Sequence, residues 1–256
     1  MMRTLCLLIG TFLLGTAQAS PLFVQRYESA QPTAEAVARA LEQVREHKEV
    51  KIIDKLKVPP FHKQLTPGVT EGEAYCQGCH LPVPHTKHLR TRAFLNMHSR
   101  YIACETCHFR PKDVNLNYRW LDYARQKAAP VEGRLRTGEA IDNGQAMTGS
   151  VKIAPFAGEE PAIAFPGSEF AQRIAQTWKD ADENGKARLK AKLHAPLEKE
   201  GPACAKCHTE EKPMLDLTAL GAPPEQARSI QRHVIPQFFG RYKADDERLK
   251  IIDILQ

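Results

Sequence analysis

The chain has 256 residues, of which 42% are hydrophobic and 7% aromatic, and it carries a formal net charge of +6. This composition is typical of a globular protein, and the length allows one large domain or two small ones. Basic residues are dispersed among acidic ones, without a long Lys/Arg block that has interleaved aromatics. The sequence therefore excludes the common pattern of a nucleic-acid-binding chain.

The first 19 residues have the layout of a secretory signal. Arg3 precedes an apolar run over 5–14, and small residues follow up to Ala19. The run is too short for a comfortable membrane span, although a retained N-terminal anchor is an alternative. Cys6 lies inside the run rather than at the cleavage point, which disfavours a lipid anchor. We expect cleavage near Ala19 and a soluble mature protein in the periplasm or outside the cell.

Local patterns predict helices and loops along the next part of the chain. A helix is expected over 33–56, with Thr33 as its N-cap, and another helix over 117–128. The stretch 131–167 is punctuated by Gly and Pro, which predicts a loop with strand around 151–156.

Three further helices are expected toward the C-terminus. Ser168 is the predicted N-cap of the first, which carries Phe170, Ile174 and Trp178. Asn184 and Gly185 are predicted to form a turn into the second, which ends near His194. The third begins after the two prolines at 223–224 and is expected to include His233.

The cysteines give the most specific signal in the sequence. There are seven, and all except Cys6 fall in pairs with the spacing Cys-x-x-Cys followed by His. In this signature two thiols add to the vinyl groups of a haem, and the adjacent imidazole binds its iron. The predicted attachment residues are Cys76, Cys79, Cys104, Cys107, Cys204 and Cys207. The predicted proximal ligands of the three covalent c-type haems are His80, His108 and His208.

Other uses of six cysteines explain the pattern less well. Three disulfides are common in exported chains, but they give no reason for a His after each pair. Zinc ribbons use paired Cys-x-x-Cys units, whereas here there are three pairs. A thioredoxin-like redox motif occurs once, beside a strand-helix-strand pattern.

With histidines crowded around two attachment motifs at 62–108, the chain resembles the multihaem c-type cytochromes. These proteins pack several haems on little polypeptide, and most of their irons are held by two histidines. In several such families a His a few residues before an attachment motif ligates a neighbouring haem, and His98 matches that position. The resemblance implies a mainly α fold with extensive loops and little regular sheet.

Seven histidines outside the motifs are available as distal ligands. His98 is the leading candidate, and His88 is placed slightly ahead of His85, which lies three residues before it. The remaining candidates are His62 and, near the third motif, His233, with His194 as its competitor there. His47 is expected at the surface. Methionine is a weaker ligand candidate than histidine, although it raises the potential; the possibilities are Met97, Met147 and Met214.

The motifs also suggest an organisation of the chain. The expected segments are a signal peptide over 1–19, an N-terminal helical segment over 20–56, a two-haem module over 57–112, a helical and loop insert over 113–200, and a third-haem module with a C-terminal helix over 201–256. The insert shows no nucleophile elbow, phosphate loop or metal-binding His pair.

Three closely spaced haems with two protein ligands each favour electron transfer over catalysis. The expected partners are redox proteins, namely a quinol-oxidising membrane complex and a terminal reductase or an outer-membrane conduit. One alternative is a haem enzyme whose third haem keeps an open face for a small nitrogen, sulfur or oxygen compound. Another is a subunit of a cytochrome filament or larger complex.

Overall fold

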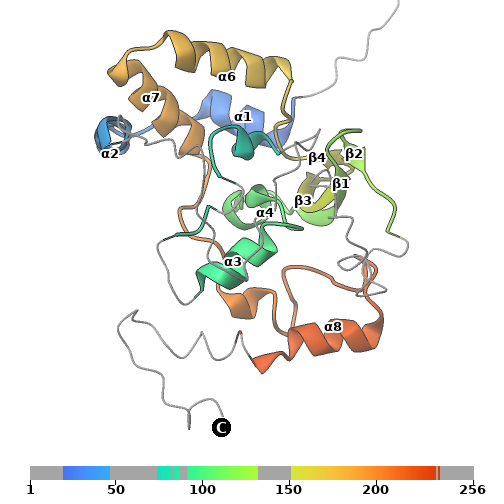
Figure 1. Cartoon of the computed structure of the whole chain (residues 1–256). Coiled ribbons are helices and arrows are strands. Elements are labelled where there is room, and N and C mark those ends of the chain that lie inside the picture. Colours follow the sequence, from blue (N-terminus) through green and yellow to red (C-terminus); the bar gives the residue numbers. More distant parts are fainter. Residues whose placement is uncertain are drawn as a thin grey trace, which may run out of the picture.

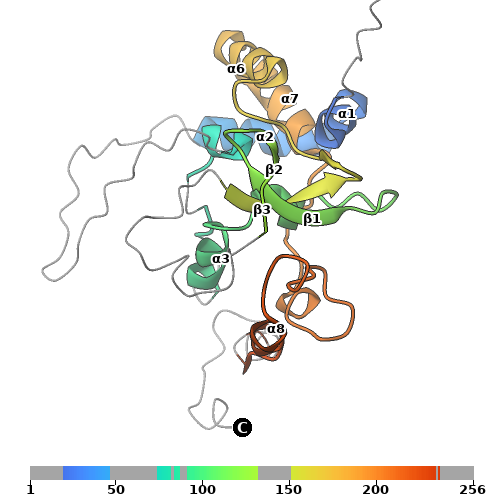
Figure 2. The ribbon, with the colours of Figure 1, turned by 90° about the vertical axis from the view of Figure 1, so that its right-hand side faces the viewer.

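The structure is a computed structural model that describes residues 20–46, 74–81, 84–86, 91–131, 151–234 and 236. The expected signal peptide lies outside the described residues. Helices α1, α2, α6 and α7 gather at one end of the molecule and α8 lies at the other (Figures 1 and 2). No helix among the described residues is long and apolar enough to cross a bilayer.

The helical end is built from two early and two late segments of the chain. They are α1 (Leu22–Ser29), α2 (Ala34–Glu46), α6 (Glu169–Asp180) and α7 (Glu183–His194), and α2 packs along α7. Thr33 and Ser168 cap α2 and α6 as predicted, because their hydroxyl oxygens accept from the Ala36 and Ala171 amides. The part of the predicted 33–56 helix beyond residue 46 lies outside the described residues.

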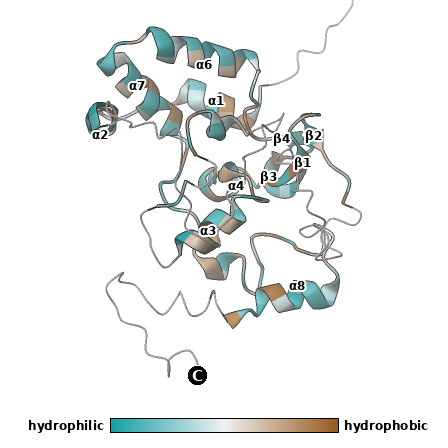
Figure 3. Ribbon diagram, viewed as in Figure 1, coloured by the Kyte–Doolittle hydropathy of each residue, from teal (hydrophilic) through white to brown (hydrophobic). Residues whose placement is uncertain are grey.

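The prediction of a turn at Asn184 and Gly185 is wrong. Both residues lie in the first turn of α7, and the Asp182 carboxylate caps this helix by accepting from the Gly185 amide at 2.7 Å. A β-carbon on Gly185 would lie 2.9 Å from the Ala181 β-carbon, so glycine allows the tight approach to the preceding loop. Most of the ribbon of α6 is coloured as hydrophilic (Figure 3). Of the three apolar residues named for this helix, Phe170 and Ile174 are buried and Trp178 is exposed.

The predicted helix over 117–128 is also wrong, because the chain forms a β-hairpin there. Strands β1 (Asn117–Asp122) and β2 (Lys127–Ala128) are joined by a turn in which Asp122 accepts from two backbone amides and Gln126 has a φ of 55°. Tyr118 and Trp120 suit a half-buried strand, and cross-strand pairing outweighs helix propensity at these positions.

The strand expected around 151–156 is present as β3 (Val151–Ala157). It pairs antiparallel with β1 and with the short β4 (Glu160–Pro161), giving a four-stranded sheet of order β2-β1-β3-β4. Burial of the interior residues of β3 on both faces suits a strand with packing on each side.

The remaining described elements carry the motifs and the segments beside them. They are η1 (Tyr75–Gly78), α3 (Arg92–His98), α4 (Cys104–His108), η2 (Cys204–Lys206) and α8 (Pro224–Gln231). Helix α8 begins at Pro224 as predicted, but it ends at Gln231, so the placement of His233 on this helix is wrong.

The described core clusters combine residues from segments that lie far apart in the sequence. The Phe23 ring of α1 packs edge-on against Phe109 and against Phe170 of α6, with ring centres 5.6 and 6.4 Å apart. All three residues belong to one apolar cluster. The Trp120 indole of β1 donates at 2.9 Å to the Leu220 carbonyl near the third motif. The insert therefore contacts both the N-terminal helices and the C-terminal module.

Candidate functional site

The second motif is helix α4, and strand β3 holds it in place. The Ile153 carbonyl accepts from the Ala103 amide and from the Thr106 hydroxyl, both at 2.8 Å. In return the Ile153 amide donates to the Tyr101 carbonyl at 2.8 Å. Since Ala103 and Thr106 are fully buried, this strand fixes where the second Cys pair points.

His108, at the end of α4, is clamped by the loop that follows α7. Its Nδ1 lies 2.8 Å from the Glu198 carbonyl oxygen, and the Glu198 amide donates back to the His108 carbonyl at 2.7 Å. Arg110 supports this loop through an ion pair with the Glu198 carboxylate. Because a carbonyl oxygen can only accept, Nδ1 carries the proton and Nε2 is left with a free lone pair.

The first motif lies against the second. The Cys76 thiol donates to the buried Glu105 carboxylate at 3.2 Å. A hydrogen bond with the Cys104 sulfur and burial raise the pKa of Cys76 well above its ordinary value. Cysteines of the first two motifs are thus neighbours.

The third motif also approaches the second. Cys107 and Cys207 pack against the same apolar cluster, which contains Trp120 and Leu220. Burial raises the pKa of Cys107 to about 11 and that of Cys207 to about 12, so both are thiols at neutral pH in the absence of a cofactor. The second motif therefore lies between the other two.

The His208 imidazole is oriented from the C-terminal helix. Its Nδ1 lies 2.8 Å from the Ile230 carbonyl oxygen of α8, which again leaves Nε2 free. The exposed 3₁₀ turn η2 precedes it, and the Met214 amide donates to the Lys206 carbonyl at 2.7 Å.

Two histidines outside the motifs lie beside motif histidines. The ring centres of His80 and His194 are 6.0 Å apart, and those of His98 and His208 are 6.1 Å apart. The Nδ1 atoms of His98 and His194 lie 2.7 and 2.8 Å from the carbonyl oxygens of Phe94 and Lys190, one helical turn back. Burial lowers the pKa of His98, His194 and His80, so the neutral imidazoles are favoured.

The other distal candidates are placed differently. The His85 Nδ1 and backbone amide both lie 3.0 Å from the Asn96 side-chain oxygen, so His85 is tied to α3. His233 is exposed beyond the end of α8. Met97 is 45% exposed, and Met214 packs against the Trp120 cluster. The candidates outside the described residues are His62 and His88, together with His47 and Met147.

The donor set fits a haem. The described residues include no cluster of three or more metal-binding side chains. A haem iron needs only two protein ligands, because the porphyrin supplies the other four. Four imidazoles with carbonyl-bound Nδ1 and free Nε2 provide the ligand form that iron requires.

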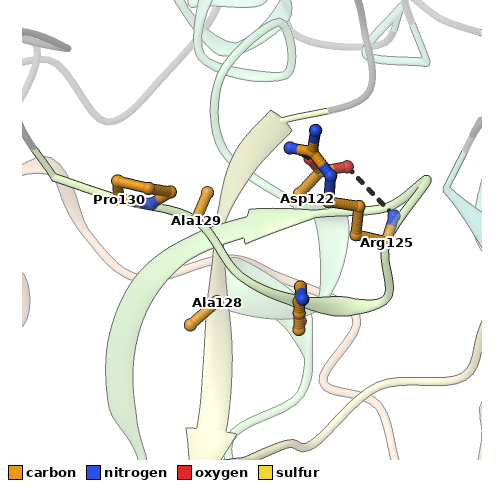
Figure 4. A pocket seen from close by; sticks show the side chains of 6 residues that line it. Asp122, Arg125, Ala128, Ala129 and Pro130 are labelled. Atoms are coloured by element: carbon orange, nitrogen blue, oxygen red, sulfur yellow. Dashed lines mark hydrogen bonds and ion pairs between the residues drawn. The ribbon is translucent and has the colours of Figure 1, made fainter.

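One hollow of about 250 Å³ lies at the β1–β2 hairpin and the residues after it (Figure 4). Its lining includes Asp122, whose carboxylate pairs with Arg125 at 3.1 Å, and Pro130. It contains no Cys or His, so its lining offers no donors for a haem iron.

Some site residues have no local sequence signal. Glu198 and Ile153 position the second motif from 90 and 47 residues away along the chain. Glu105 fills an unspecified position of its motif, and its burial depends on tertiary packing. His194 was assigned to the third motif by its position in the chain, whereas its ring lies beside His80 of the first.

No protein-family model, curated protein sequence or solved structure matches this chain.

Proposed function

We propose that the chain is an exported c-type cytochrome with three covalent haems that relays electrons between redox proteins of a respiratory chain. The six paired cysteines tether the haems, and His80, His108 and His208 are the proximal ligands. The proposed protein is mainly α-helical and packs around its haems, and its small sheet positions the second motif.

The convergence of the motifs is the observation that carries this proposal. Cys76 reaches Cys104 and Glu105, while Cys107 and Cys207 share one apolar cluster. The second and third motifs are separated by the whole insert, and their approach is what a series of neighbouring haems requires. Haems bound at these motifs would lie near one another, which would favour rapid electron transfer along the series first, second, third.

The protein's own residues tether the haems, orient the imidazoles that bind iron and shield the site from water. Haem iron supplies the one-electron redox chemistry. Backbone carbonyls of Glu198 and Ile230 orient the imidazoles of His108 and His208, and hydrogen bonding of this kind also tunes the potential. The Trp120 cluster excludes water between the second and third motifs.

The enzymatic alternative with an open third haem has less support. The His98 ring lies 6.1 Å, centre to centre, from the His208 ring, so a second imidazole is at hand near the third motif. The proposed partners are a quinol-oxidising membrane complex and a terminal reductase or an outer-membrane conduit. Filament assembly stays a prediction, which concentration-dependent light scattering of the loaded protein checks.

Intact mass spectrometry of the exported protein tests the proposal. We expect the mass of the chain cleaved near Ala19 plus three haems, and no thiol that reacts with an alkylating agent. Replacing the Cys204 and Cys207 pair by Ala removes one haem and leaves two, whereas Cys6→Ala is a control that retains all three. A mature chain with six alkylatable thiols, or with disulfides and no haem, would overturn it.

A further inference from the structure

Two pairs of imidazoles have the same arrangement in different parts of the molecule. His80 pairs with His194 at the end of α7, and His98 at the end of α3 pairs with His208. Each pair consists of one motif histidine and one histidine from a distant segment. The ring planes cross at 75° in the first pair and 81° in the second.

The spacing of these rings corresponds to two ligands of one metal ion. A metal–imidazole bond measures about 2.0–2.1 Å and the ring centre lies about 1.1 Å beyond the nitrogen, so imidazoles on opposite sides of one ion have centres about 6.3 Å apart. The observed separations of 6.0 and 6.1 Å differ from this value by less than a bond length.

Hydrogen bonding also leaves the required nitrogen free. The Nδ1 atoms of His194, His98 and His208 each lie 2.7 to 2.8 Å from a backbone carbonyl oxygen. Since these oxygens only accept, the unprotonated atom is Nε2, which carries the lone pair that binds iron. For His194 and His98 the carbonyl belongs to the preceding turn of the same helix, so the helix itself fixes the ring.

Edge-to-face stacking is the competing explanation for each pair. Aromatic rings stack at such angles with centres about 4.5–7 Å apart, and no metal is needed. Stacking alone gives no reason why each pair joins one motif histidine to one other histidine. It also gives no reason for the same proton placement on three of the four rings.

We propose that His194 is the distal ligand of the iron bound by His80, and that His98 is the distal ligand of the iron bound by His208. This assignment rests on the proposed function, and it differs from assignment by sequence proximity. His194 precedes the third motif but serves the first haem, and His98 precedes the second motif but serves the third. The third haem is thereby tied to the two-haem module through α3.

Electron paramagnetic resonance on the oxidised, haem-loaded protein tests the assignment, with spins counted per chain. His194→Gly and His98→Gly are each expected to convert one low-spin ferric iron per chain to high spin. Added imidazole returns that iron to low spin. Lys192→Ala, on the same helix as His194, is the matched control and leaves the count unchanged. His194→Phe keeps an aromatic ring for stacking and is expected to give the same high-spin iron as His194→Gly.

Removing one haem at a time identifies which iron each histidine serves. In protein without the first haem (Cys76→Ala with Cys79→Ala), His194→Gly adds no high-spin iron and His98→Gly adds one. In protein without the third haem (Cys204→Ala with Cys207→Ala), His194→Gly adds one high-spin iron and His98→Gly adds none. If His194→Gly still adds a high-spin iron without the first haem, the pairing is overturned.

Failure of this inference is distinguishable from failure of the proposed function. Three haems by mass, with no high-spin iron in His194→Gly or His98→Gly, overturn the ligand assignment and leave the trihaem cytochrome intact. A mature chain without haem overturns the proposed function itself. The single-variant spin counts require no haem-deleted protein, so they decide whether His194 and His98 are distal ligands even where a deletion variant fails to load.

Discussion

The second and third motifs have the same spacing but are held in different ways. The second is a short helix in which Thr106 is fully buried and donates a hydrogen bond to Ile153 of β3. The imidazole of His108, at the end of this helix, is oriented by the Glu198 carbonyl. The third is an exposed 3₁₀ turn in which Cys204 is exposed and one long-range bond, from His208 to Ile230, orients the imidazole.

The difference teaches that the fold is organised around the second motif. Its neighbours come from the N-terminal helices, the sheet and the loop after α7, so changes there disturb several segments together. Among the described residues, the third motif region is held by the Trp120 bond to Leu220 and by the bond of His208 to Ile230 of α8. Substitutions near the second motif should therefore cost more stability than matched substitutions near the third.

Phe109→Ala is expected to lower the free energy of unfolding more than any other substitution considered. Phe109 follows the second motif directly, is 0% exposed and packs edge-on against Phe23. Its removal leaves a cavity, and we expect the free energy of unfolding of the haem-loaded protein to fall by about 3–5 kcal/mol. Urea unfolding followed by circular dichroism measures this loss.

Leu217→Ala is the corresponding truncation of an apolar side chain near the third motif. Leu217 is only partly buried against the Trp120 cluster, so the expected loss is smaller, roughly 1–2 kcal/mol. Equal losses for the two variants would contradict the comparison between the motifs.

The sequence predicts the local features of this site and not its tertiary ones. The motifs, the caps at Thr33 and Ser168, and the strand at β3 follow from patterns within a few residues. The pairing of His80 with His194 joins positions 114 residues apart, and no local pattern encodes it. The spacing of Trp120, Leu121 and Ala124 predicts a helix over 117–128, whereas the observed β1–β2 and β1–β3 pairing depends on tertiary context.

Glu105→Gln in the second motif is expected to have an intermediate effect, on how the free energy of unfolding depends on pH. Burial raises the pKa of Glu105, and its Oε2 atom has no hydrogen-bond partner among the described residues. Once Cys76 forms a thioether, the carboxyl also loses the thiol that donates to it. The folded protein therefore keeps this proton to a higher pH than the unfolded chain, whose carboxyl ionises near pH 4.5.

The sign of the pH effect follows from proton linkage. Above pH 4.5 the folded state binds more protons at Glu105 than the unfolded state, so the stabilising contribution falls as the pH rises toward the raised pKa. The slope is at most about 1.4 kcal/mol per pH unit for one proton. Urea midpoints between pH 4.5 and 7 should decline less steeply in Glu105→Gln than in the parent. Parallel profiles would show that this carboxyl ionises normally in the folded protein.

The smallest effects are expected for two threonines, Thr106 inside the second motif and Thr209 beside the third. Thr106→Val removes the hydroxyl that donates to the Ile153 carbonyl at 2.8 Å inside the core. That carbonyl keeps the Ala103 amide as a donor, so the loss should be about 1 kcal/mol rather than the larger penalty of an unpaired group. Thr209→Val, beside the third motif, removes an exposed contact of 3.2 Å with the Glu211 amide and should change the free energy of unfolding by less than about 0.5 kcal/mol. The same urea titration measures both variants. If Thr209→Val proves the more costly, the third motif is held by the fold as firmly as the second, and the order of dependence inferred for the two motifs is wrong.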